Sequence, residues 1–99
     1  MDLTRIEGFD WDDGNRRKST DRHGVGQAEA EQVFLDPRLL VSADEKHSAS
    51  QARFDALGTT SAGRLLQISF TLRQDETKIR VISARDGSRK ERTAYEKET

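Results

Sequence analysis

The most regular pattern along the chain lies between residues 64 and 73. Apolar and polar side chains alternate there, with Leu66, Ile68, Phe70 and Leu72 on one side and Gln67, Ser69, Thr71 and Arg73 on the other. A period of two residues predicts a β-strand that turns one face to the core. Residues 74–77 then predict a hairpin turn. Residues 78–85 predict a strand with apolar side chains on both faces, as in a central strand covered on two sides.

Three shorter stretches also predict strands. Residues 8–12 alternate aromatic and polar positions, so that Phe9 and Trp11 would share one face. Residues 39–41 and 53–57 are weaker candidates. Residues 43–50 are polar and predict a loop between them.

Helical patterns differ in strength. Residues 27–35 place apolar side chains at helical spacing, namely Ala30, Val33 and Phe34. Ser88 and Glu91 fit a capping box, which predicts a terminal helix that runs to about residue 97. Residues 13–22 hold no apolar side chain, so the pattern predicts a loop there unless the rest of the fold or a ligand holds a helix in place.

With that helix included, the order of elements is strand, helix, helix, successive strands and helix. This order predicts an α+β fold in which a small antiparallel β-sheet carries two N-terminal helices and one C-terminal helix. We expect residues 1–99 to form a single domain.

Composition limits how large the core can be. Only 32% of the 99 residues are apolar, and nine of these are alanine, whereas 17 basic and 18 acidic side chains nearly cancel. We expect a folded domain of marginal stability. The chain lacks an apolar run of membrane-spanning length or a secretory signal pattern, so we expect a cytoplasmic protein that does not contact a membrane. It has no cysteine, which excludes disulfides, thiolate metal sites and cysteine nucleophiles.

The charges are unevenly distributed along the chain. Residues 1–50 hold 7 basic and 11 acidic side chains, and residues 51–99 hold 10 and 7. Residues 64–92 contain six arginines, at positions 64, 73, 80, 85, 89 and 92. The planar guanidinium fork matches phosphate oxygens, so this enrichment suits a phosphate backbone. The alternative is a solvated surface paired with neighbouring acids.

Several kinds of catalytic chemistry find no support in the motifs. His23 and His47 are the only histidines, and neither lies in a metal-binding spacing such as HExxH. The chain also lacks a GxSxG turn and a phosphate-binding glycine loop, so we expect neither a metal nor a cofactor. RNA cleavage remains possible without a metal, because the substrate's 2′-hydroxyl can attack the neighbouring phosphorus. The protein then supplies proton carriers and fixed cations, although the same residues would also serve simple binding of RNA or DNA.

An ordered set of segments resembles the BrnT family over residues 8–96. The segments include Phe9-Asp10-Trp11-Asp12, Arg22-His23-Gly24-Val25, Asp36-Pro37, His47-Ser48, Arg53-Phe54, Gly63-Arg64-Leu65-Leu66, Ile79-Arg80-Val81-Ile82-Ser83-Ala84-Arg85 and Tyr95-Glu96. This resemblance implies a ribonuclease toxin of a type II toxin–antitoxin module with a RelE-like fold. It also implies metal-independent RNA cleavage and a BrnA-like ribbon-helix-helix antitoxin as partner. The toxin would then contact operator DNA only through this antitoxin.

Seven positions match the family's basic and aromatic pattern: Trp11, His23, His47, Arg53, Arg64, Arg80 and Arg85. We expect catalysis from Arg64, Arg80 and Arg85, which would stabilise the phosphate, and from His23, which would carry a proton. The other three, Trp11, His47 and Arg53, are expected to bind RNA. The resemblance further implies a helix over residues 13–22, against the loop that the pattern predicts.

The chain departs from the family at three positions. Ala52 stands where a glutamate is common, Arg22 where a lysine is usual, and Ser19 where an asparagine is usual. If that glutamate orients the neighbouring arginine or handles a proton in relatives, this protein is slow or uses another group.

Each candidate residue also has a purely structural explanation. Arg80 could be the ion-pair partner of Asp10 or Asp55, and Arg64 and Arg85 could form exposed salt bridges of small energetic value. His23 could bond backbone carbonyls at a helix end, and Trp11 and Tyr95 could be packing residues. The rival functional hypothesis is accordingly a non-catalytic module that binds an antitoxin or nucleic acid through the same basic surface.

Overall fold

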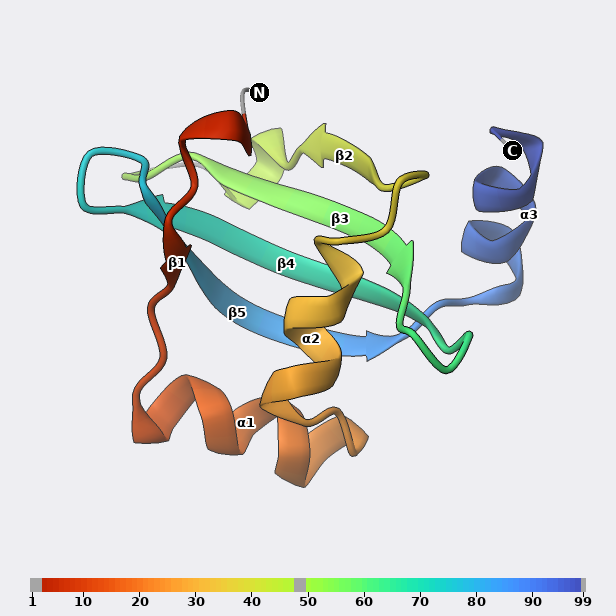
Figure 1. The fold of residues 1–99 in the computed structure, drawn as a ribbon, viewed down its shortest axis with the longest axis horizontal. Coiled ribbons are helices and arrows are strands. Elements are labelled where there is room, and N and C mark those ends of the chain that lie inside the picture. Colours follow the sequence, from red (N-terminus) through yellow and green to blue (C-terminus); the bar gives the residue numbers. More distant parts are fainter. Residues whose placement is uncertain (1–2, 48–49, 99) are drawn as a thin grey trace.

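A computed structural model of the chain describes residues 3–47 and 50–98. It contains a five-stranded sheet of order β1-β5-β4-β3-β2 (Figure 1). The strands are β1 (Gly8–Phe9), β2 (Leu40–Ala43), β3 (Arg53–Thr59), β4 (Leu65–Arg73) and β5 (Lys78–Asp86). The helices are α1 (Asp13–His23), α2 (Gln27–Val33) and α3 (Arg89–Lys97), with short 3-10 turns η1 (Leu3–Arg5) and η2 (Glu45–His47). The predicted α+β fold is confirmed, although β1 pairs with β5 in parallel and the other strand pairs are antiparallel.

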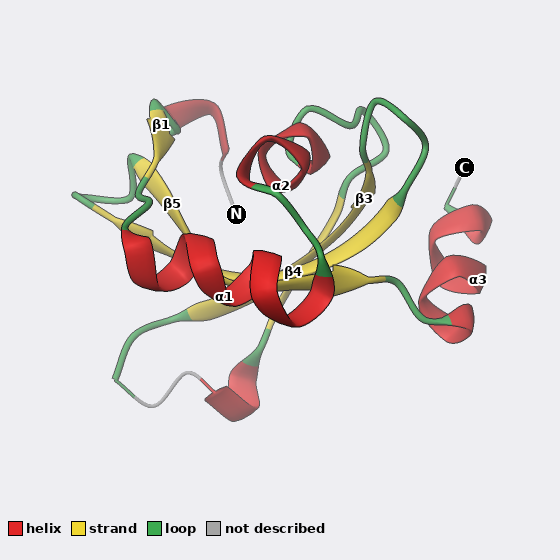
Figure 2. Ribbon diagram, turned by 90° about the horizontal axis from the view of Figure 1, so that it is seen from below, coloured by secondary structure: helices red, strands yellow, loops and turns green. Residues whose placement is uncertain are grey.

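The apolar core lies on one face of the sheet. Leu66, Ile68 and Phe70 of β4 are fully buried there, together with Ala30 and Val33 of α2. Helices α1 and α2 lie on this side, whereas η2 lies on the other (Figure 2). The alternation read from the sequence therefore separates a covered face from a polar one.

Helix α1 corrects the prediction of a loop at residues 13–22. The side-chain amide of Asn15, which is 7% exposed, donates to the carbonyls of Asp10 at 3.1 Å and Val81 at 3.0 Å. Asp12 and Asn15 also exchange side-chain to backbone hydrogen bonds at the first turn. At the other end, Gly24 has a φ of 64° and its N–H donates to Thr20. Polar docking and capping replace the apolar face that the sequence lacks.

Strand β5 corrects a second prediction. Its apolar residues at successive positions predicted a strand covered on both faces, but they arise from a β-bulge. Ser69 pairs with Ser83 and Phe70 pairs with Val81, so Ile82 is an extra residue in a β-bulge. A bulge shifts the alternation by one position. Ile82 thus joins the polar face while Val81 remains in the core.

The other elements follow the sequence closely, with small shifts at their ends. The predicted helix over residues 27–35 ends at Val33, and the predicted strand over residues 8–12 is reduced to Gly8–Phe9. The polar segment 43–50 contains η2, while its residues 48 and 49 lie outside the described part of the chain. The capping box of α3 is confirmed, because Ser88 and Glu91 each accept a hydrogen bond from the other's backbone N–H.

Helix α3 is held to the body of the protein through Tyr95, which is 5% exposed and therefore a packing residue, as predicted. Its hydroxyl donates to Oδ2 of Asp36 at 2.5 Å, and the same oxygen accepts from the backbone N–H of Thr59 at 2.8 Å. Burial tends to raise the pKa of Asp36, but the hydrogen bonds from Tyr95, Thr59 and Arg38 outweigh it and lower that pKa.

Substitution Tyr95→Phe should lower the free energy of unfolding at pH 7 by about 1–2 kcal/mol, because a hydrogen bond to a carboxylate is lost. The pKa of Asp36 is lower in the folded state, so this bond stabilises the protein above pH 4 and is lost as the pH falls. Urea unfolding at pH 7 and pH 3 should therefore show a smaller difference from the unsubstituted protein at pH 3. The double variant with Asp36→Asn should lose less than the sum of the two single variants, and strict additivity would contradict the account.

Candidate functional site

The polar face of the sheet carries a basic pocket beside η2. Arg53, Thr71 and Arg80 are paired across β3, β4 and β5, so their side chains stand in one row. The pocket has a volume of about 190 Å³ and is lined by His47, Ser50, Gln51, Arg53, Thr71, Arg73, Arg80 and Ile82. The structure thus brings together three of the seven predicted site residues, which come from distant parts of the sequence: His47, Arg53 and Arg80.

His47 is paired with an acid that the sequence analysis missed. Its Nδ1 lies 2.8 Å from Oδ2 of Asp44. When Nδ1 is protonated, its N–H donates a hydrogen bond to this carboxylate, and the unprotonated Nε2 can accept a proton. The side chain of His47 is 62% exposed and that of Asp44 only 16%, so the acid is fixed and the imidazole reaches solvent. Asp44 precedes His47 by three residues in the sequence, and this spacing was the signal that could have identified the pair.

Arg80 is held in place by two acids next to α1. Its Nη2 donates to Oδ2 of Asp12 at 2.8 Å, and its Nη1 lies 3.6 Å from Oδ2 of Asp10. The backbone N–H of Asn15, followed by the Arg80 guanidinium, lowers the pKa of Asp12. The suggested pairing with Asp10 is therefore present. The suggested pairing with Asp55 is wrong, because that carboxylate accepts from the side chains of Gln67 and Ser69.

A guanidinium fixed in this way suits an anion that arrives in the pocket. Among the described residues, the one side-chain hydrogen bond that Arg80 donates is the bond from Nη2 to Asp12. A guanidinium has five N–H donors, so donors are left for a phosphate. The side chain is 23% exposed, which leaves part of it open to a ligand. The two acids fix its position before a ligand binds.

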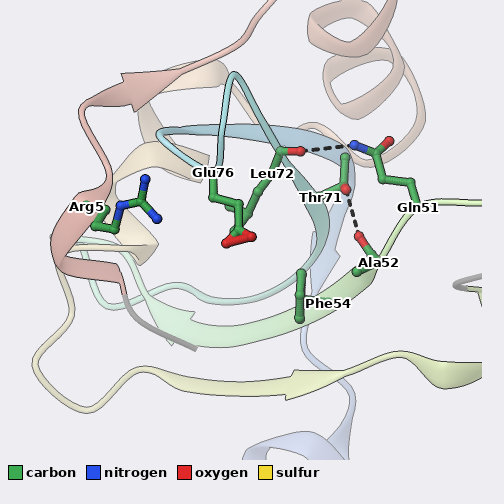
Figure 3. A pocket seen from close by; sticks show the side chains of 7 residues that line it. All are labelled: Arg5, Gln51, Ala52, Phe54, Thr71, Leu72 and Glu76. Atoms are coloured by element: carbon green, nitrogen blue, oxygen red, sulfur yellow. Dashed lines mark hydrogen bonds between the residues drawn. The ribbon is translucent and has the colours of Figure 1, made fainter.

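A larger hollow of about 510 Å³ adjoins this pocket and shares Gln51 and Thr71 with it. Figure 3 shows Ala52 and Phe54 at its edge, with Arg5 and Glu76 across from them. The Thr71 hydroxyl donates to the carbonyl of Ala52 at 2.7 Å, which holds this residue beside the strand. Ala52, where a glutamate is common in the resembling family, thus lines this hollow.

Arg64 lies at the opposite end of β4, about 23 Å from Thr71 at 3.3 Å per residue. Its guanidinium donates to Asp86 at 2.7 and 3.1 Å, to Glu29 at 3.1 and 3.2 Å, and to the carbonyls of His23 and Gly24. The hydrogen bonds that Arg64 donates to Asp86, and then those to Glu29, raise its pKa. Arg64 therefore ties the loop after α1 to the ends of β4 and β5, and His23 belongs to this cluster through its carbonyl.

Arg85 has a separate partner on α3. It forms a bidentate ion pair with Glu91, at 2.8 and 2.9 Å. The hydrogen bonds that Arg85 donates to Glu91 raise the pKa of Arg85, and the same bonds lower the pKa of Glu91 against the effect of burial. This pair connects β5 with the first turn of α3, so its position does not bring Arg85 into the pocket of Arg80.

Trp11 lies with the core. Its ring packs against the buried cluster, and its indole N–H donates to Oε2 of Glu31 on α2 at 2.7 Å. This places Trp11 on the helix-covered side of the sheet, away from the pocket. The roles predicted for Trp11, His23, Arg64 and Arg85 stay predictions.

Two searches of the described residues gave negative results. Across residues 3–47 and 50–98, we find no cluster of three or more His, Cys, Asp or Glu side chains arranged to hold a metal ion. In the same part of the chain, no helix has the length and apolarity needed to cross a membrane.

Comparison with known proteins supplies the family. The family model described as "Ribonuclease toxin, BrnT, of type II toxin-antitoxin system" matches residues 11–91. A crystal structure of the Brucella abortus ribonuclease toxin BrnT matches with a TM-score of 0.60 and 20% sequence identity, covering 83% of this chain and 97% of that chain. At this identity the structural likeness shows a shared fold. No curated protein matches the chain.

Substitution Arg64→Met should lower the free energy of unfolding by about 1–2 kcal/mol, since it leaves two carboxylates and two carbonyls without their donor. Arg92→Met is the matched control, because Arg92 is exposed on α3 and makes no ion pair among the described residues. Urea unfolding of both variants measures the difference. Equal stability of the two would show that the Arg64 cluster does not hold the fold together.

Proposed function

Because this chain belongs to the BrnT family of ribonuclease toxins of type II toxin–antitoxin systems, we propose that it cleaves RNA without a metal in the pocket beside η2. The observation that carries this proposal is the convergence of His47, Arg53 and Arg80 on a pocket of about 190 Å³. In attack by a 2′-hydroxyl, a histidine can accept the 2′ proton and two cations can stabilise the charge that develops on the phosphate. We further propose that residues 1–99 act as one toxin domain.

In the proposed reaction, Nε2 of His47 accepts the proton of the 2′-hydroxyl. The 2′ oxygen then bonds to phosphorus, and the bond to the 5′ oxygen breaks. That oxygen takes a proton from a water molecule, which in turn takes the proton held by Nε2 of His47, so the imidazole returns to its starting state. The products are a 2′,3′-cyclic phosphate and a free 5′-hydroxyl. Arg80 and Arg53 would stabilise the extra negative charge of the pentacoordinate transition state, and Asp44 would orient the imidazole through Nδ1.

The family implies an antitoxin partner as well as an RNA substrate. We propose that the antitoxin is a BrnA-like ribbon-helix-helix protein and that operator DNA is bound only through it. A partner that binds only the folded toxin also stabilises it by mass action, which suits a chain with so few large apolar residues. We propose the cytoplasm as the place where toxin, antitoxin and RNA meet.

Ala52 keeps a second candidate function under consideration. A glutamate is common at this position in the BrnT family. Without that glutamate, the same basic surface could bind RNA and leave the RNA intact. Incubating the purified protein with total RNA in EDTA separates the two functions. Cleavage supports the enzyme, and retention of intact RNA supports the binding module.

Substitution Arg80→Ala should lower the rate of RNA cleavage by about 10²–10³-fold, the usual effect of removing one group that stabilises a developing anion. Arg80 also holds Asp10 and Asp12, so thermal unfolding must show that the variant is folded. Arg80→Lys, which keeps the charge, should recover part of the rate. Unchanged cleavage by a folded Arg80→Ala protein would refute the proposed site.

Substitution His47→Asn should lower kcat by about 10²–10⁴-fold, because the proposed proton acceptor is removed. His23→Asn is the matched comparison, since it alters the other histidine of the chain. Rates measured with an oligoribonucleotide at constant pH should fall far more for His47→Asn. The reverse order would return the role of proton carrier to His23, as the sequence predicts.

A further inference from the structure

Helix α1 is unusual in composition for a helix packed on a sheet. Its eleven residues include no apolar side chain, and four of them are basic, Arg16, Arg17, Lys18 and Arg22, against two acids, Asp13 and Asp21. All four basic side chains are exposed. A helix that is polar all round is stable only when other interactions hold it, and here these are the hydrogen bonds of Asn15 and the caps. Packing against the core therefore does not account for the four basic side chains of α1.

Among the residues that the structure describes, three of the four basic side chains of α1 lack an acidic partner. Arg16 pairs with Asp13. In the described part of the chain, Arg17, Lys18 and Arg22 make no ion pair and no side-chain hydrogen bond. Their charges are therefore available to an anion from outside the protein.

The position of α1 connects it to the pocket. Strand β1 pairs with β5 only at Lys78 and Ile79, and α1 lies beside the rest of that edge (Figure 1). The helix begins directly after Asp12, the residue that binds Arg80 at 2.8 Å. The first basic side chain of α1, that of Arg16, thus follows Asp12 by about one helical turn, and the basic positions continue to Arg22, about 9 Å further along the helix.

We propose that α1 binds the phosphate backbone of the RNA strand outside the cleaved bond, through Arg17, Lys18 and Arg22. This inference rests on the proposed function, because it assigns the substrate's flanking phosphates to a surface next to that pocket. Exposed basic side chains match phosphate charge without reading the bases. The continuity with Arg80 favours RNA over an acidic protein partner, since a strand held in the pocket must leave it along one of its edges.

The test compares two sets of substitutions, each of which removes three positive charges. One variant carries Arg17→Gln, Lys18→Gln and Arg22→Gln on α1, and the control carries Lys90→Gln, Arg92→Gln and Lys97→Gln on α3. Both sets remove three exposed positive charges from a helix, and glutamine is a good helix former. Thermal unfolding checks that each variant is folded. Binding is measured by fluorescence anisotropy with a 2′-O-methylated oligonucleotide, which the proposed reaction cannot cleave.

The α1 variant should bind this oligonucleotide about 10–100-fold more weakly at low salt. The slope of log affinity against log salt should fall in magnitude by about 2, at about 0.7 for each lost phosphate contact with a single strand. Its deficit in cleavage should be larger with a long oligoribonucleotide than with a dinucleotide, whereas the α3 control should behave like the unsubstituted protein.

Three outcomes would overturn the inference. These are an unchanged salt slope in the α1 variant, an equal loss in the α3 control, and unaltered RNA binding combined with weaker binding of the antitoxin encoded beside the toxin. The last would make α1 an antitoxin surface. Failure of the proposed function has a different signature, because the unsubstituted protein would then bind the oligonucleotide without cleaving any RNA.

Discussion

Most of the large apolar side chains that the described residues bury lie on one face of the sheet, whereas Leu65, which is 2% exposed, lies on the side of Gln67 and Ser69. In β4, Leu66, Ile68 and Phe70 face α2, while Gln67, Ser69 and Thr71 face away. The chain has too few large apolar residues for a second layer, so helices cover only one face. The other face is left polar and open, and the row that includes Arg53 and Arg80 stands on it. The thin core thus leaves open the face on which we propose that phosphate binds.

Each helix owes part of its position to a polar contact. Asn15 holds α1 to β5, Arg64 holds the turn before α2 to the ends of β4 and β5, and Tyr95 holds α3 through Asp36. Such bonds are directional and become costly when one partner is removed, because the other stays partly buried and unsatisfied. In this small domain they fix helices that the apolar core alone would not orient.

The features that could be predicted from the sequence are those that depend on residues close together in the chain. The alternation in β4 and the capping box of Ser88 are local patterns, and both appear as expected. The hydrophobic pattern missed helix α1, which the family resemblance implied, because Asn15 bonds to Val81, 66 residues away. The bulge at Ile82 was missed because it depends on how β4 and β5 pair. The candidate site was predicted in part: His47, Arg53 and Arg80 were named, but only tertiary contacts separate them from the clusters around Arg64 and Arg85.

A crystal structure with an oligonucleotide that carries a 2′-O-methyl group at the cleavage site tests the central claim most directly. The account predicts that the phosphate next to the methylated ribose lies within hydrogen-bond distance of the guanidinium of Arg80, with Nε2 of His47 facing the blocked 2′ oxygen. A phosphate bound instead at the cluster of Arg64, Asp86 and Glu29, at the other end of β4, would contradict it.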